Sequence, residues 1–325
     1  MQTPGRADLL PMLANLTEAS FEATAEAVFA YQSVHNSVYS KYLGLLGHSN
    51  IQRPFLPISF FKTHRVQTGI WEAETEFNSS GTSGQTPSRH LVRHLDFYLK
   101  NASEGFAQYY GDPSKWAILA LLPSYLEREG SSLVAMADYF IQNSQYEESG
   151  FFLNDFGKLK AALSSCKSKD CKILLLGVSF ALLDFAERCP MDLNGVTIME
   201  TGGMKGRRRE LTRTELHETL KDAFGVNEVH SEYGMTELFS QAYALGDSRF
   251  RPTKTMRVFA NELNDPFCPV SHGRTGVLNI IDLANLDTCS FIQTEDIGRV
   301  FSDGSFEVLG RMDVAEMRGC NLMVE

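Results

Sequence analysis

Residues 172–200, KILLLGVSFALLDFAERCPMDLNGVTIME, decide the fold class of this chain. The apolar runs at 172–178 and 196–200 are strand-like, and the segment at 180–188 between them has helical spacing. A strand, a helix and a second strand in this order are typical of two parallel strands joined by a crossover helix. The sequence therefore predicts an α/β core built on a parallel sheet.

The chain before this unit is predicted to be helical at first. Residues 17–43 open on the cap-like Thr17 and place apolar side chains at helical spacing, so we expect one amphipathic helix ending before Gly44. Further on, residues 91–110 are predicted to be a helix and residues 117–122 a strand. These two elements extend the α/β core toward the N-terminus.

After residue 254 the pattern becomes β-rich. Short apolar segments are separated by Gly and Asp, as is typical of antiparallel strands, and they cover residues 257–260, 277–282, 299–301 and 306–309. The resulting division has an N-terminal helical segment leading into the core (1–76), an α/β subdomain (77–254), a β-rich subdomain (255–310) and a hinge remnant (311–325).

Composition excludes several classes of protein. A chain of 325 residues with 43% hydrophobic residues can bury a large core, and a net charge of −10 argues against a nucleic-acid partner. No stretch of eighteen apolar residues occurs, so no integral membrane segment is expected. The six cysteines form no CxxC pair or zinc-like cluster. We expect a cytoplasmic protein with free thiols, and its oligomeric state is not readable from the sequence.

A loop rich in glycine and hydroxyl side chains, SSGTSGQTP, covers residues 79–87. Glycines let backbone amides approach and cradle phosphate oxygens, and the hydroxyls add donors. The loop lacks the GxxxxGK[ST] arrangement of a P-loop, so it does not predict a kinase-like NTPase. Taken alone, such a segment is more often an ordinary surface turn.

Three later segments carry groups that suit a nucleotide. EYGMTE (232–237) offers an aromatic face for a base, with Thr and Glu for a phosphate and its Mg²⁺. TEDIGR (294–299) places an acid that can accept both hydroxyls of a ribose. GRMD (310–313) follows near the end of the chain. Each segment alone also fits core packing, solvated charge or a β-turn.

Taken together and in this order, the segments resemble the adenylate-forming superfamily of acyl-CoA synthetases, peptide-synthetase adenylation domains and luciferases. SSGTSGQTPSR resembles its phosphate loop SGTTGxPK, METGG (199–203) its Gly-Gly turn beside adenine, and EYGMTE its YGxTE motif. TEDIGR resembles the TGD motif, and GRMDVAEMRGCN the hinge GRxDxxIKxxG. The resemblance spans residues 77–325 and implies the N-terminal core fold of that superfamily, with parallel βαβ sheets, helices and an antiparallel β-rich subdomain.

The resemblance implies ATP and Mg²⁺ as cofactors and assigns one set of residues to the phosphates. Thr236 is expected to contact the α-phosphate, and Glu237 is expected to help hold Mg²⁺. The phosphate loop itself corresponds to Ser80, Gly81, Thr82, Ser83 and Gly84. The loop departs from the family pattern because it ends in Pro-Ser-Arg rather than Pro-Lys.

A second set of residues is implied for the nucleoside. Gly202 and Gly203 are expected to flank the adenine, and Tyr233 to stack on it. Asp296 is expected to bind the ribose hydroxyls, and Arg311 to reach the ribose or a phosphate.

The largest departure lies at the C-terminus. Family members usually continue into a lid domain that carries an adenylation lysine, whereas this sequence ends at Glu325, so the lid is expected to be absent or vestigial. Glu316 also stands where many relatives have Lys. Among short relatives the pattern is most similar to LuxE-type acyl-protein synthetases, which pass a fatty acyl group to their own cysteine. Cys320 occupies that position, although it also fits a small apolar side chain packed at the hinge.

The expected reaction joins a carboxylic acid, with a fatty acid as the family-level expectation, to AMP. A carboxylate is already ionised near neutral pH, so no general base is needed. The mixed anhydride is then a good acyl donor to a thiolate such as that of Cys320, and onward to a partner such as an acyl reductase. Two alternatives stay open: the core of an acyl-CoA or aryl-CoA ligase without its C-terminal domain, and a non-catalytic nucleotide-binding module.

Other residues are interpreted structurally. His90, His94 and His230 are each expected to be satisfied structural histidines, and the basic run at 205–209 to be the solvated start of a helix. Phe60 and Phe61 are predicted to belong to the core, with Lys62 exposed to solvent.

Overall fold

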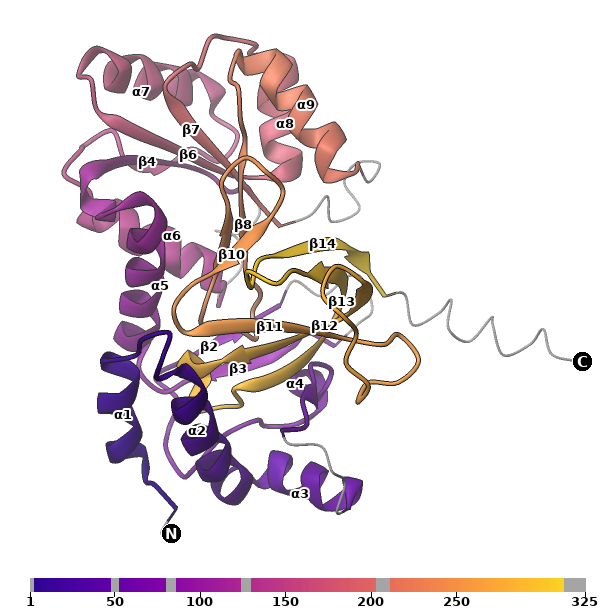
Figure 1. Cartoon of the computed structure of the whole chain (residues 1–325). Helices are drawn as coiled ribbons and strands as arrows, with labels where there is room; N and C mark the ends of the chain where they lie inside the picture. The colour runs from indigo at the N-terminus through magenta and orange to yellow at the C-terminus, as the bar shows by residue number, and fades with distance from the viewer. Residues whose placement is uncertain (1–2, 48–52, 80–85, 124–129, 203–210, 313–325) are drawn as a thin grey trace, which may run out of the picture.

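The computed structural model describes residues 3–47, 53–79, 86–123, 130–202 and 211–312 (Figure 1). Within these ranges, twelve strands form one mixed sheet. Its parallel half consists of β5 (Gly150–Phe151), β4 (Trp116–Leu121), β6 (Lys172–Val178), β7 (Val196–Thr201) and β8 (His230–Tyr233). The predicted strand–helix–strand unit is confirmed, because β6 and β7 pair in parallel on either side of α8 (Ser179–Arg188).

The other half of the sheet is antiparallel, as predicted for the C-terminal segments. It continues from β8 through β9 (Ala242–Ala244), β10 (Phe250–Pro252), β14 (Phe306–Arg311), β13 (Phe291–Val300), β12 (Thr275–Asp282) and β11 (Met256–Asn261). A short strand, β1 (Leu56–Pro57), pairs in parallel with β13. The TEDIGR segment lies within β13 rather than in a turn, because its backbone pairs with β12 on one side and β14 on the other.

Helices cover both faces of the parallel half. Figure 1 shows α7 (Phe156–Ser168), α8 and α9 (Arg213–Phe224) above β4, β6 and β7, with α5 (Leu95–Tyr110) and α6 (Ser132–Asn143) below them. The strands read as continuous apolar runs because both of their faces are buried. Helix α5 begins later than predicted, since Arg89–Val92 forms β3, which pairs with β2 (Thr75–Asn78) in a separate two-stranded sheet.

The N-terminal helices pack against the antiparallel half. Where one helix was predicted, the structure has α2 (Phe21–His35) and α3 (Ser37–Leu46), preceded by α1 (Arg6–Ala14). The single-helix prediction is wrong because Asn36 leaves helical geometry, and its side-chain oxygen accepts hydrogen bonds from the amides of Val38 and Tyr39. The ring of Tyr39 stacks on Phe291 of β13 at 6.1 Å, so these helices share a core with the β-rich part.

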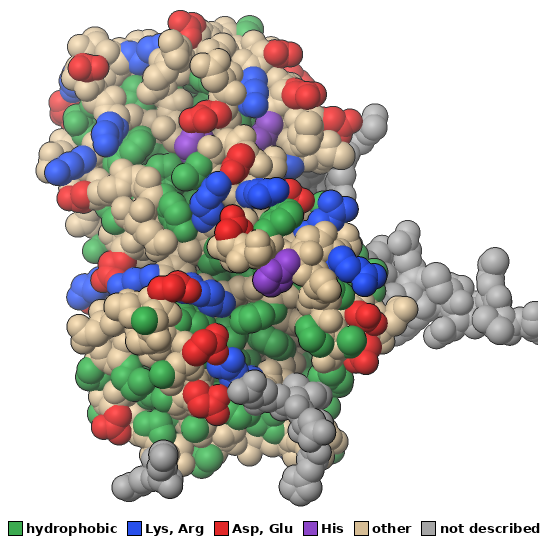
Figure 2. All heavy atoms as spheres, viewed as in Figure 1, with side chains coloured by type: hydrophobic (Ala, Val, Ile, Leu, Met, Phe, Trp, Pro, Cys, Tyr) green, Lys and Arg blue, Asp and Glu red, His purple; other side chains and the backbone are tan. Residues whose placement is uncertain are grey.

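Charges on the face shown in Figure 2 are interspersed, with acidic and basic side chains next to one another. No broad basic surface is present on that face, which agrees with the overall net charge of −10. In the described part of the chain, no helix combines the length and apolar character needed to cross a membrane.

Candidate active site

The first group of predicted residues meets where the carboxyl end of β8 lies near β13 and β14. Tyr233 is the last residue of β8, and its hydroxyl donates a hydrogen bond of 2.7 Å to Oδ2 of Asp296 in β13. Arg311 stands opposite Asp296 in β14, with its Nε 3.9 Å from Asp296 Oδ1 and its Nη2 3.3 Å from Glu295 Oε2. Three residues distant in sequence are therefore neighbours.

The ring of Tyr233 is held by aromatic contacts. Phe306 meets it edge-on at 5.2 Å, and Phe250 lies at 5.6 Å. Burial raises the pKa of Tyr233 well above its usual value, and the negative charge of Asp296 raises it further, so the phenol stays a donor. Burial also raises the pKa of Asp296, while the hydrogen bond from Tyr233 and the charge of Arg311 oppose that rise. The carboxyl of Asp296 keeps acceptor capacity on Oδ1 for a further hydroxyl.

The loop after β8 is fixed from three sides. Oδ2 of Asp282, at the end of β12, accepts hydrogen bonds from the amides of Phe239 (2.8 Å) and Ser240 (2.9 Å). Asn285, in the short 3₁₀ helix η2 (Leu283–Asn285), donates through Nδ2 to the carbonyl of Glu237 at 2.8 Å. Because buried polar groups that are fully bonded have little freedom, the backbone before and after Glu237 is rigid.

The third support is His90 in β3. Its Nδ1 lies 2.9 Å from the carbonyl of Thr236, so Nδ1 carries the proton and donates, while Nε2 lies 2.9 Å from Thr288 Oγ1. Burial lowers the pKa of His90 to about 4, which keeps the ring neutral near pH 7. The expectation of a satisfied structural histidine is confirmed for this residue.

The Glu237 side chain is buried, with 6% of its surface exposed. Burial raises the pKa of its carboxyl, while a hydrogen bond from Ser88 and the positive charges of Arg311 and Lys62 oppose that rise. Among the described residues, no Lys or Arg makes a direct ion pair with it within 4.0 Å. A buried carboxylate that lacks a direct cationic partner is a suitable ligand for a hard cation such as Mg²⁺.

The ends of β7 and β8 are tied together beside Tyr233. The Thr201 hydroxyl donates to Oε2 of Glu232, and the carbonyl of Gly202 accepts a hydrogen bond of 2.8 Å from Ser179. Burial raises the pKa of Glu232 to about 7, and the charge of Glu200 adds to the rise while the Thr201 hydrogen bond opposes it. A Cβ at Gly234 would lie 2.5 Å from Glu232 Oε1, so a larger residue there would displace this carboxyl.

Part of the predicted site falls on positions that the structure does not describe. Outside the described residues lie Ser80, Gly81, Thr82, Ser83, Gly84, Gly203 and Cys320. The two ends of the phosphate loop are described, and they are bonded to each other: the Ser79 amide donates to the Ser88 carbonyl at 3.0 Å, and the Ser88 amide to Ser79 Oγ at 2.8 Å. Since Ser88 also bonds Glu237, the loop begins and ends beside that carboxylate.

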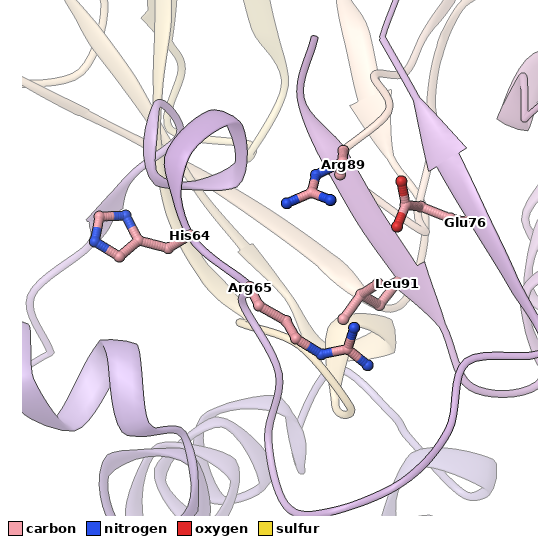
Figure 3. A pocket seen from close by; sticks show the side chains of 5 residues that line it. All are labelled: His64, Arg65, Glu76, Arg89 and Leu91. Atoms are coloured by element: carbon pink, nitrogen blue, oxygen red, sulfur yellow. The ribbon is translucent and has the colours of Figure 1, made fainter. Parts of the chain in front are cut away.

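A small recess of about 40 Å³ lies on the outer face of the β2–β3 hairpin (Figure 3). Figure 3 shows Glu76 and Arg89 side by side on the two strands, with Arg65 reaching toward Leu91 from the segment after α4 (Phe60–Thr63). Sequence reasoning did not single out these residues or the supports Ser88, Asp282 and Asn285. The one feature of the sequence that could have pointed to this recess is Arg89, which ends the Pro-Ser-Arg segment where the family has Pro-Lys.

No protein-family model matches the chain, and no curated protein matches its sequence. ATP-bound MatB from Rhodopseudomonas palustris matches in structure with a TM-score of 0.54 at 15% identity, over 73% of this chain and 47% of that one. A luciferase-like enzyme from the nonluminescent Zophobas morio mealworm matches with a TM-score of 0.51 at 17% identity, over 76% and 59%.

At these identities the likeness shows the fold alone. The chain spans about half the length of the MatB chain that it matches. Its fold is that of the N-terminal core of adenylate-forming enzymes, as the sequence predicted.

Proposed function

We propose that this chain uses ATP and Mg²⁺ to convert a carboxylic acid into an acyl adenylate, with release of pyrophosphate. The observation that carries the proposal is the meeting of Tyr233, Asp296 and Arg311 beside the buried carboxylate of Glu237. The fold shared with ATP-bound MatB supports it.

Each described residue then has a defined task. The Tyr233 ring and the turn at Gly202 enclose the adenine, and Asp296 accepts the ribose hydroxyls through its remaining lone pairs. Arg311, whose side chain is 61% exposed, would reach a phosphate or the ribose. The backbone amides of the loop between Ser79 and Ser88 supply donors to the phosphates.

The chemical step needs positioning and charge stabilisation. A carboxylate oxygen of the substrate attacks the α-phosphorus, the bond from that phosphorus to the bridging oxygen breaks, and pyrophosphate leaves with the electron pair. No proton has to move. Bound Mg²⁺ would neutralise phosphate charge, with Glu237 helping to hold it, and Thr236 would contact the α-phosphate. His90 and Asn285 bond the backbone carbonyls of Thr236 and Glu237, respectively.

Exchange of labelled pyrophosphate into ATP tests the proposal directly. We expect exchange that depends on both Mg²⁺ and an acid when a panel of short, long and aromatic acids is supplied to the purified chain. ATP binding without exchange for any acid would instead favour the non-catalytic nucleotide-binding module.

Asp296→Ala tests the nucleoside half of the site. We expect the apparent KM for ATP to rise about tenfold or more with a smaller change in kcat, because a buried carboxylate that bonds a hydroxyl contributes mainly to binding. Steady-state exchange kinetics measure both constants. Asp96→Ala, which removes a surface aspartate paired with Lys100, is the matched control. An unchanged KM in the Asp296 variant would contradict the assignment.

The finer proposal is that Cys320 receives the acyl group, as in LuxE-type acyl-protein synthetases acting on fatty acids. Met312 is fixed at the site, because its amide donates to the carbonyl of Glu295 at 2.7 Å. Cys320 follows Met312 by eight residues, and an extended chain of that length spans at most about 29 Å. This length allows the Cys320 thiol to reach the acyl adenylate. Its sulfur would form the C–S bond as the bond from the acyl carbon to AMP breaks, with the thiol proton passing to solvent.

Intact mass after incubation with ATP, Mg²⁺ and fatty acids separates the possible acceptors. We expect an acyl-sized, hydroxylamine-labile adduct on the wild type and none on Cys320→Ser, with pyrophosphate exchange retained in both. Exchange without any adduct, together with product formation on addition of coenzyme A, would favour the acyl-CoA ligase core. Transfer from the adduct to an acyl reductase would identify the class of the downstream partner.

A further inference from the structure

Lys62 lies in α4, which packs against β3 beside the proposed phosphate site. The ring of its neighbour Phe61 meets the His90 ring at 5.4 Å, and His90 holds the carbonyl of Thr236. Lys62 therefore directly follows Phe61, whose ring packs on His90, and His90 holds the backbone of the residue before Glu237. Contrary to expectation, its side chain is partly buried rather than fully exposed, because α4 is packed on the hairpin.

The segment that carries Lys62 faces the hairpin that bounds the phosphate loop. His64 and Arg65 line the same recess as Glu76, Arg89 and Leu91 (Figure 3). Arg89 directly follows Ser88, which closes the loop. The recess therefore joins the residues that directly follow α4 to the strand that leaves the loop.

Electrostatics single out Lys62 from the other cations. The carboxylate of Glu237 is influenced by the positive charges of Arg311 and Lys62. Arg311 already faces Glu295 at 3.3 Å and Asp296 at 3.9 Å. For Lys62, no carboxylate among the described residues lies within ion-pair distance. A partly buried lysine whose charge acts on Glu237 without an ion pair to it is available to a bound anion, and a phosphate with its metal suits both charges.

We propose that Lys62 is a catalytic residue that contacts the β- or γ-phosphate of ATP from the side opposite Glu237. The proposal rests on the proposed function. As the bond between the α-phosphorus and the bridging oxygen breaks, negative charge gathers on the leaving pyrophosphate, and the ammonium of Lys62 stabilises it without giving up a proton. The cation is supplied by the N-terminal part of this chain.

The test compares Lys62→Met, which keeps length and removes charge, with Lys62→Arg and with Lys41→Met at an exposed position of α3. We expect Lys62→Met to lower the maximal rate of ATP–pyrophosphate exchange about 30- to 100-fold and to raise the apparent KM for pyrophosphate at least tenfold. Lys62→Arg should recover a large part of both, and Lys41→Met should match the wild type. Melting temperatures of all the variants should agree.

The outcomes distinguish this proposal from the one on which it rests. No exchange by the wild type with any acid would overturn the proposed function itself. Normal exchange by Lys62→Met, in a wild type that is active, would overturn only the role of Lys62. An equal loss in the Met and Arg variants with a lower melting temperature would assign Lys62 to structure and would also overturn the proposal.

Discussion

Glu237→Gln is expected to lower the maximal rate of ATP–pyrophosphate exchange by about two to three orders of magnitude while the chain stays folded. Glutamine keeps the size of the side chain and one carbonyl oxygen, but it removes the negative charge that a divalent cation requires. The backbone of residue 237 is held independently by Asn285, and that of Thr236 by His90, so the loop should keep its position.

A titration with Mg²⁺ gives this prediction its sharpest form. The variant should need a higher Mg²⁺ concentration to reach half of its maximal rate, because loss of the carboxylate weakens binding of the metal and not binding of the acid substrate. Glu218→Gln, on the exposed side of α9, is the control and should be indistinguishable from the wild type. If the Gln variant shows the wild-type rate and Mg²⁺ dependence, Glu237 is not a metal ligand.

The parallel half of the fold could be predicted from the sequence because its strands are buried on both faces. Such strands consist of uninterrupted apolar residues, and those predicted at 172–178 and 196–200 agree with β6 and β7 to within one residue. The break at Asn36 was missed because helical spacing continues across it, and only the local hydrogen bonds of its side chain stop α2.

Prediction of the candidate site from the sequence was likewise restricted to residues that lie in local motifs. Tyr233, Glu237, Asp296 and Arg311 could be proposed as site residues because each lies in a short motif with a recognisable order. The supports at Asp282 and Asn285, and the proposed phosphate contact Lys62, belong to no such motif. They come to the site through sheet pairing and helix packing between distant segments, and one sequence does not reveal those contacts.

The second large effect concerns stability and involves Glu232. Its pKa in the folded chain is raised from a usual value near 4.5 to about 7, chiefly by burial. Between these values the folded chain binds more protons than the unfolded chain, so the free energy of unfolding falls as pH rises through this window. The full fall is about 3 kcal/mol for a shift of this size. Below pH 4.5 this group imposes no penalty.

Glu232→Gln should remove this pH dependence. An amide stays neutral at every pH in the window, and its oxygen can still accept the hydrogen bond from Thr201. Urea unfolding of the wild type and the variant at pH 5, 6, 7 and 8 measures the difference. We expect the variant to gain up to about 3 kcal/mol relative to the wild type between pH 5 and pH 8. Glu228→Gln, at a side chain that is 61% exposed and two residues before the start of β8, should give no such gain. Parallel curves for wild type and Glu232→Gln would mean that Glu232 titrates as an ordinary glutamate, and that the ends of β7 and β8 do not bury its charge.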